Sequence, residues 1–260
     1  MNIILKISRT ISDIAAITRR NLIRYTRLPQ LIVFSTIQPV MFLLLFTYVF
    51  GGAIQPTGFH DYITFLLPGI IVQTVLFGSM QTGIGLAEDL SRGMIDRFRS
   101  LPMAHSAILA GRTLTDMLRN AFVIVLMVIV GFLIGFRIEH GIGKFGIAVL
   151  LTLLFGFAFS WVSATVGLMV KEVETAQVAG FIWIFPLVFA SSIFVPIETM
   201  PAWLQSFANY TPITATVDAV RALSLGQPWQ TDFWQAVLWT LGILLFFIPL
   251  SVYFYNKRKS

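Results

Sequence analysis

The chain has 260 residues, of which 57% are hydrophobic and only 12% are charged, and its mean hydropathy is +0.82. About a quarter of the residues in soluble domains are charged, so this composition excludes a water-soluble globular protein and indicates a protein solvated by lipid. The net charge is +6 and there is no cysteine, which excludes disulfides, cysteine nucleophiles and cysteine-based metal sites.

Residues 1–30 are expected to form an amphipathic helix in the membrane interface. Arginines, among them Arg20 and Arg24, follow one stripe of this helix. A second stripe is apolar, is interrupted by Thr18, and contains Ile7, Ile11, Ile14, Leu22 and Tyr25. Such a helix buries its apolar side among acyl chains and sets its arginines on anionic headgroups. We expect no removable signal peptide, because no short apolar core with a small-residue cleavage site is present.

Six apolar runs follow, and each is long enough to cross a bilayer as a helix, which takes about 20 residues. The runs are Leu31–Phe50, Ile63–Ala87, Ile108–Phe136, Phe145–Val170, Ala176–Val195 and Phe233–Tyr255. Fifteen of the 18 Lys and Arg residues fall on one side, and only Arg137, Lys144 and Arg221 fall on the other. Cytoplasmic loops are enriched in Lys and Arg, so both termini are expected in the cytoplasm. The basic charge therefore indicates orientation, and we expect no nucleic-acid partner.

The first inner connection, residues 88–103, is the most densely charged segment in the middle of the chain. Its apolar residues recur at helical spacing and are Leu90, Met94, Ile95, Phe98 and Leu101. Its charged residues on the other side are Arg92, Asp96, Arg97 and Arg99. This pattern predicts an amphipathic helix at the cytoplasmic end of the bundle, on which a soluble partner could push. An ordinary surface helix in a cytoplasmic loop is the alternative.

The last outer connection, residues 196–232, is long and rich in aromatic and aliphatic residues. Two short helices are expected in it, near Ala202–Tyr210 and Ile213–Leu225, with Asp218 and Arg221 at i, i+3 spacing on the second. We expect these helices to dip into the outer leaflet as a re-entrant hairpin or to cap the outer end of the bundle. Irregular backbone does not face lipid, so either arrangement requires packing against protein.

These elements predict an all-α fold: a polytopic membrane helix bundle with six transmembrane helices, formed by one domain over residues 1–260. Its parts would be the interfacial helix 1–30, the six-span bundle 31–255 with the inner helix 88–103 and the outer hairpin 196–232, and a cytoplasmic tail 256–260.

No catalytic centre is visible in the sequence. There is no phosphate-binding loop, and none of the histidines has a carboxylate or second histidine at ligand spacing, so we assign no catalytic residue and no metal site. Arg112, Asp116 and Arg119 lie at the inner start of the third run and are expected to pair with one another at the cytoplasmic interface. The apolar middles of the runs carry no ionisable residue, so no proton relay is evident and the energy for transport must come from elsewhere.

Two segments carry a family resemblance. Glu88–Met103, followed by Gly111–Arg119, resembles the cytoplasmic signature of type-2 ABC transporter permeases. Phe194–Leu204, followed by Pro212, Asp218, Arg221–Leu223 and Gly226, is similar to the outer hairpin of the daunorubicin-resistance branch of that family. Together with the length and the six-run layout, the resemblance covers essentially the whole chain. Drug, lipid and glycan exporters share these signatures.

The resemblance implies a permease of the bacterial inner membrane that dimerises with a second copy or a similar permease. A separate ABC ATP-binding subunit would hold ATP and Mg²⁺, and this chain would bind no cofactor. The resemblance implies that the contact with the ATP-binding subunit is made by Arg20, Arg24, Glu88, Arg92, Asp96, Arg97 and Arg99. The residues implied in an outer gate are Trp203, Phe207, Asp218 and Arg221.

The second and fifth runs combine small and aromatic side chains. A cavity lined in this way suits a bulky amphipathic molecule such as an aromatic antibiotic or a lipid, and the candidates for the substrate path are Gln73, Phe77, Phe181 and Phe185. Close helix packing by the small residues is the simpler interpretation. A membrane enzyme or an assembly scaffold without transport activity is the alternative function, and a copurifying ATPase would separate the two.

Overall fold

The computed structural model describes residues 3–27, 29–52, 54, 61–94, 105–170 and 172–257. Within these ranges all regular structure is helical and no strand occurs, which confirms the predicted all-α class. The helices are α1 (Ile3–Arg27), α2 (Pro29–Leu45), α3 (Tyr62–Ser91), α5 (His105–Leu133), α6 (Ile142–Met169), α7 (Val173–Phe189), α8 (Ala202–Ala208), α9 (Pro212–Leu225) and α10 (Gln230–Lys257). A π-helical turn, Phe46–Phe50, continues α2, and a 3₁₀ turn, Ile197–Thr199, precedes α8.

Four helical segments are long and apolar enough to cross a membrane: Tyr62–Ser91, Ala107–Leu133, Ile142–Met169 and Gln230–Lys257. Within the described part of the chain, the segments Ser35–Phe50 and Val173–Phe189 are apolar but shorter. Four of the six expected crossings thus meet both conditions within single helices. The fifth run ends sooner than expected, because α7 stops at Phe189 and residues 190–196 follow an irregular path.

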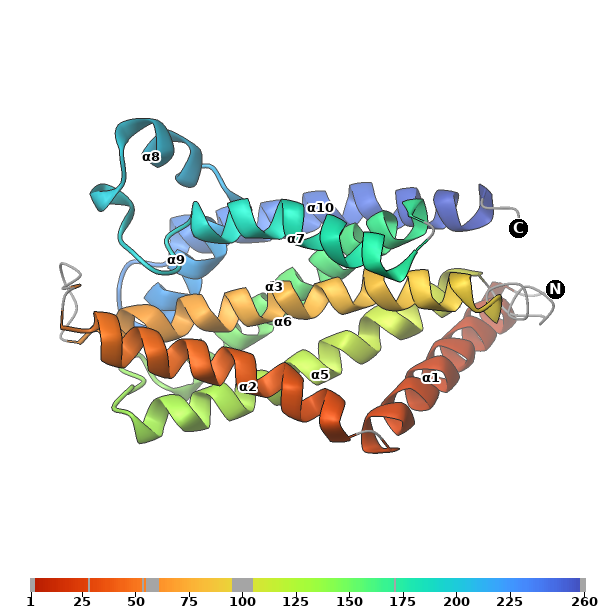
Figure 1. Ribbon diagram of the computed structural model, residues 1–260, viewed down its shortest axis with the longest axis horizontal. Coiled ribbons are helices and arrows are strands. Elements are labelled where there is room, and N and C mark those ends of the chain that lie inside the picture. Colours follow the sequence, from red (N-terminus) through yellow and green to blue (C-terminus); the bar gives the residue numbers. More distant parts are fainter. Residues whose placement is uncertain are drawn as a thin grey trace.

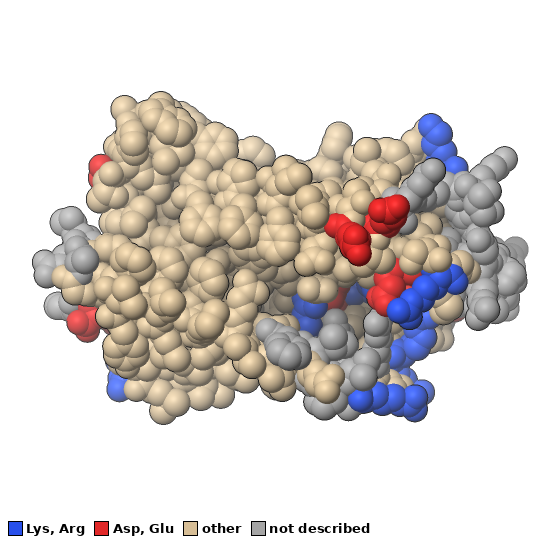
Figure 2. Space-filling view, in the orientation of Figure 1, with Lys and Arg blue, Asp and Glu red and all other residues tan. Residues whose placement is uncertain are grey.

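The long helices lie side by side, and α1 begins at the same end of the bundle at which α10 ends (Figure 1). The segment that carries α8 and α9 lies at the opposite end. On the face seen in Figure 2, most charged side chains gather at the end near the two termini, and the rest of the surface is largely uncharged. This distribution matches the charge asymmetry expected from the sequence.

Helix α3 is the centre of the bundle and packs against α2, α5, α6, α7 and α9. Its apolar residues occur on all sides, as expected for a helix surrounded by protein, and most of its length is buried. Close contact with α6 depends on Gly83 and Gly167, since a Cβ atom on either residue would collide with the backbone of the other helix. Small residues allow such backbone contact between membrane helices.

Helix α1 packs against the first half of α5. Thr18 donates hydrogen bonds from its hydroxyl to the carbonyl oxygens of Ile14 (2.8 Å) and Gly111 (3.1 Å), and Ile17 is buried beside it. Thr18, expected to interrupt the apolar stripe, is therefore part of the contact. Ile11, which was expected in that stripe, is 61% exposed.

Helix α9 has clear signals at both ends. The Thr211 side chain accepts a hydrogen bond from the Thr214 amide, Pro212 occupies the first turn, and Gly226 ends the helix in the left-handed conformation (φ 87°). Nearly every residue of α9 is buried. The two short helices expected in the outer connection are present as α8 and α9.

Candidate functional site

Two buried arginines define polar regions within the apolar bundle. The outer arginine cluster consists of Phe65, Ser192, Asp218 and Arg221. The inner arginine cluster consists of Gly78, Thr82, Asp116 and Arg119.

In the outer arginine cluster, the Arg221 guanidinium joins three parts of the chain. Its Nη1 pairs with Asp218 Oδ1 at 2.6 Å, its Nη2 donates to the Ser192 carbonyl oxygen at 2.8 Å, and its Nε donates to the Phe65 carbonyl oxygen at 3.1 Å. The guanidinium carbon also lies 3.8 Å from the centroid of the Phe65 ring. Arg221 thereby ties α9 to α3 and to the segment after α7.

The partners of Arg221 explain how an arginine is accommodated there. Burial lowers the pKa of the Arg221 guanidinium, and the Asp218 carboxylate beside it opposes that shift. Asp218 also accepts a hydrogen bond from the Ser192 hydroxyl at 2.8 Å. Nearby, the Tyr62 hydroxyl donates to the Phe194 carbonyl oxygen at 2.9 Å, so two carbonyl groups of the irregular segment after α7 have donors.

A cavity of about 590 Å³ opens beside the outer arginine cluster. Glu198, Asp218 and Asp232 line it with carboxylates, and Arg221 is also in its wall. The predicted gate residues therefore separate into two groups. Asp218 and Arg221 meet in the cluster, whereas Trp203 and Phe207 lie on α8, which projects from the bundle, and are 74% and 48% exposed (Figure 1).

In the inner arginine cluster the carboxylate is buried more deeply. Arg119 Nη1 pairs with Asp116 Oδ1 at 3.3 Å, and its Nη2 donates to the Gly78 carbonyl oxygen at 2.6 Å. The Thr82 hydroxyl donates to Asp116 Oδ2. Asp116 and Arg119 are 4% and 7% exposed. Gly78 is needed for this approach, because a Cβ atom there would collide with the Asn120 amide and the Arg119 guanidinium.

The position of this pair corrects a prediction from the sequence. Asp116 and Arg119 do pair, but they lie against the middle of α3, away from the expected cytoplasmic interface. The reason is that α5 already begins at His105, so that Arg119 falls halfway along the helix. Arg112 is not part of this pair and instead binds Asp89 of α3, a contact that the sequence pattern gave no means of finding.

The predicted coupling residues fall only partly within the described chain. Glu88 and Arg92 form an ion pair of 2.7 Å at the inner end of α3, with the Arg92 side chain 67% exposed. Arg20 is exposed on α1 and donates to the Asn21 side chain at 3.0 Å. The Arg24 side chain lies outside the described residues, as do Asp96, Arg97 and Arg99. The first turn of the expected inner helix, residues 88–91, is the last turn of α3.

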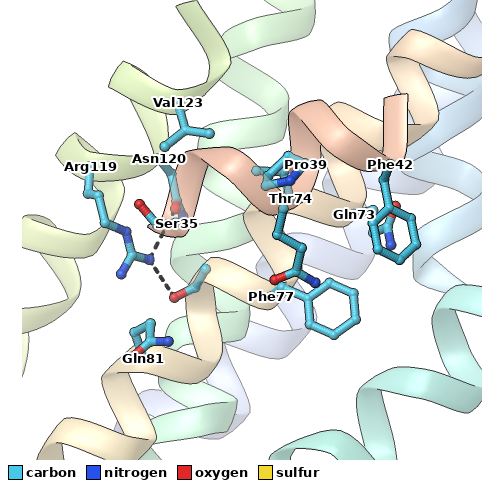
Figure 3. Close-up of a pocket in the computed structure, with 12 residues that line it drawn as sticks. Ser35, Pro39, Phe42, Gln73, Thr74, Phe77, Gln81, Arg119, Asn120 and Val123 are labelled. Carbon is cyan, nitrogen blue, oxygen red and sulfur yellow. Dashed lines mark hydrogen bonds between the residues drawn. The ribbon is translucent and has the colours of Figure 1, made fainter. Parts of the chain in front are cut away.

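A second cavity, of about 80 Å³, lies at mid-height between α2, α3 and α5 (Figure 3). The residues that line it are Ser35, Gln38, Pro39, Phe42, Gln73, Thr74, Phe77, Gly78, Gln81, Arg119, Asn120 and Val123. We refer to it as the amide cavity, because four of these side chains are carboxamides. Gln73 and Phe77 were predicted from the sequence, whereas Gln38 and Asn120 were not, although their polar character within apolar runs was an available signal.

The other two predicted path residues, Phe181 and Phe185 of α7, are not in the wall of the amide cavity. Their ring centroids lie 6.1 and 5.7 Å from that of Phe77, so the three rings form an aromatic patch between α3 and α7. Both α7 phenylalanines are partly exposed. In the part of the chain that the structure describes, no group of three or more His, Asp or Glu side chains could hold a metal ion.

Comparison with known proteins matches residues 12–225 to the model of the family described as ABC-2 type transporter. The chain is 35% identical to the daunorubicin resistance ABC transporter permease protein DrrB1 of Streptomyces coeruleorubidus, over 93% of this chain and 85% of that protein. It is 22% identical to the probable doxorubicin resistance ABC transporter permease protein DrrC of Mycobacterium tuberculosis, over 90% of this chain and 85% of that protein. The matched region includes both arginine clusters and the amide cavity. The family resemblance found in the sequence is confirmed, and the chain belongs to the ABC-2 type transporter family.

Proposed function

We propose that this chain is the membrane permease subunit of an ATP-driven exporter of the bacterial inner membrane. Its cargo would be a hydrophobic or amphipathic drug, lipid or glycolipid, taken from the cytoplasm or the inner leaflet. Family membership supports the transport role, and the relatives named for daunorubicin and doxorubicin resistance support export of such molecules.

The observation that carries this proposal is the course of α3. This single buried helix begins beside the outer arginine cluster, passes the amide cavity and the inner arginine cluster, and ends in the exposed Glu88–Arg92 pair. A push on its inner end would therefore be transmitted as a rigid-body movement to both clusters.

We further propose six crossings, with both termini in the cytoplasm. The helix Pro29–Leu45 and its π-helical continuation to Phe50 would supply one of the two further crossings. Helix α7, with the buried segment after it, would supply the other. The concentration of Lys and Arg at the end that holds the termini supports this orientation.

A separate ABC ATP-binding subunit would supply the energy for transport. It would hold ATP and Mg²⁺ and bind at the inner end of a permease dimer. The proposed contact surface contains Arg20, Arg24, Glu88, Arg92, Asp96, Arg97 and Arg99. The exposure of Arg92 at the tip of the central helix supports its inclusion. The second permease of the dimer would be another copy of this chain or a similar protein.

Release would occur at the outer end. Asp218 and Arg221 would hold the gate closed, and the exposed rings of Trp203 and Phe207 would form its lid in the outer leaflet. On the way, the aromatic patch of Phe77, Phe181 and Phe185 would contact the apolar part of the cargo.

The test is export in inside-out vesicles that contain this chain and its ATP-binding subunit. We expect ATP-dependent accumulation of daunorubicin, which is measured by the fluorescence of the drug. No accumulation is expected when the ATP-binding subunit is absent or catalytically inactive. Accumulation by this chain alone would contradict the dependence on a partner. Lack of accumulation of daunorubicin and of fluorescent lipid in the complete complex would contradict the exporter function.

A further inference from the structure

The amide cavity brings neutral hydrogen-bonding side chains together beside Arg119, within helices that are otherwise largely apolar. It is lined by the carboxamides of Gln38, Gln73, Gln81 and Asn120. These residues come from helices α2, α3 and α5, and none of them lies near a helix end. Polar side chains within membrane segments are costly unless they face a partner, a cavity or a pathway.

Two polar atoms in this wall lack a hydrogen-bond partner among the described residues: Gln73 Oε1 and Asn120 Nδ2. Gln73 and Asn120 are only 4% and 2% exposed. A buried donor or acceptor without a partner lowers stability, so its presence calls for a reason. The terminal torsions of Asn and Gln are soft, and a small rotation turns either amide toward the cavity. Gln73 Oε1 is a hydrogen-bond acceptor and Asn120 Nδ2 is a donor.

The charge in the wall is already compensated. Arg119 is held by Asp116, by the Gly78 carbonyl oxygen and by Asn120 Oδ1 at 3.2 Å (Figure 3). Among the described residues that line the cavity, the other polar groups are neutral amides and hydroxyls. A charged ligand group would lose its hydration without gaining an ionic partner, whereas a neutral one would be matched.

The rest of the wall is apolar and comes from Pro39, Phe42, Phe77 and Val123. The ring of Phe77 belongs both to this wall and to the aromatic patch with α7, so the cavity adjoins the proposed path of the cargo. Gln38 is exposed on α2 and lies at the edge of the cavity. A space of about 80 Å³ takes the polar part of a ligand and leaves its apolar body outside.

We propose that the amide cavity is a binding subsite for a neutral hydroxyl- or carbonyl-bearing part of the amphipathic cargo. Asn120 donates to the ligand oxygen, Gln73 accepts from the ligand hydroxyl, and Gln38 closes the site from α2. The subsite refines the proposed export function by setting a preference for cargo with uncharged hydrogen-bonding groups.

The test measures equilibrium binding of daunorubicin, which carries hydroxyl and carbonyl groups on an aromatic body, without ATP. The complex of this chain and its ATP-binding subunit is placed in lipid nanodiscs. We expect Asn120→Leu to raise the Kd about tenfold, as expected for one lost hydrogen bond in a buried site, and Gln38→Leu to raise it by a smaller factor, because Gln38 is exposed. Thr152→Val is the matched control, because its hydroxyl is buried on α6 and bonds only within that helix to the Ala148 carbonyl. It should leave the Kd unchanged.

Two further measurements make the result decisive. Binding of tetraphenylphosphonium, an aromatic cation without hydrogen-bonding groups, should be the same in all four proteins, and a parallel loss in Asn120→Leu would overturn the subsite. An unchanged daunorubicin Kd in both amide variants, or no saturable binding by the unmodified complex, would mean that the cavity holds only water. Because binding is measured without ATP, failure of the subsite is distinct from failure of vesicle export.

Discussion

The two arginine clusters have the same local arrangement at two positions along α3. In each, an Asp three residues before an Arg forms an ion pair on one helix, and the Arg reaches across to a carbonyl oxygen of α3. They differ in their surroundings. Asp116 is almost fully buried, whereas about a third of the Asp218 side chain is exposed beside a cavity of about 590 Å³. The comparison indicates that the inner pair fixes the packing of α5 on α3, while the outer pair borders a cavity.

The largest expected difference is in stability. Arg119→Met leaves the Asp116 charge buried without its partner, which costs about 3–5 kcal/mol, so folded yield in detergent should collapse. Arg221→Met leaves Asp218 in reach of water and should lower the melting temperature less. Thermal unfolding of both variants measures the difference, and Asp116→Asn combined with Arg119→Met should recover part of the loss. Equal losses in the two single variants would remove the distinction between the clusters.

A smaller loss is expected from Gly78→Ala. The added methyl group meets the Asn120 amide and the Arg119 guanidinium, and overpacking of this kind costs about 1–3 kcal/mol. The control is Gly146→Ala on α6, where a Cβ atom meets nothing within 4 Å and alanine favours the helix. Melting temperatures of the two variants give the comparison, and a stable Gly78→Ala protein would contradict the close contact of α3 and α5.

The largest loss of export is expected from substitutions in the outer arginine cluster. Arg221→Lys keeps a positive charge but cannot bridge Asp218, Ser192 and Phe65 with one planar group. We expect export to fall several-fold while binding of the ATP-binding subunit persists. Trp203→Ala on α8 should also reduce export without lowering stability. Normal export by Arg221→Lys would exclude the outer pair as a gate.

The smallest effect on stability is expected at the inner tip of α3. The Glu88–Arg92 pair is on the surface, and such pairs contribute about 0–1 kcal/mol. Arg92→Glu should therefore leave the melting temperature unchanged. Charge reversals at Arg97 and Arg99 test the rest of the proposed contact surface. All three reversals should reduce the amount of ATP-binding subunit that copurifies. Full recovery of the complex would contradict the proposed coupling surface.

Much of the fold could be predicted from the sequence, because apolar runs, proline positions and capping residues are local signals. The short helix ending at Gly226 is one example, since Thr211, Pro212 and Gly226 mark its ends. The packing partners could not be predicted in this way. The spacing of Asp116 and Arg119 identifies a pair on one helix, but the absence of a side chain at Gly78, on another helix, decides where that pair is buried. The amide cavity was missed for the same reason, since Gln38 and Asn120 come from different helices and line one cavity only in the folded chain.

The irregular segment after α7 has a further consequence for movement. A single guanidinium holds the Ser192 carbonyl, the Phe65 carbonyl and the Asp218 carboxylate. Asp218 lies on the same helix as Arg221 and moves with it, so sliding of the segment after α7 along α3 must break the bond to the Ser192 carbonyl, the bond to the Phe65 carbonyl, or both. One planar group cannot follow two backbone segments that separate. Opening at this end should therefore be a two-state transition. The bonded and the separated arrangements should both be populated, with few molecules in intermediate arrangements.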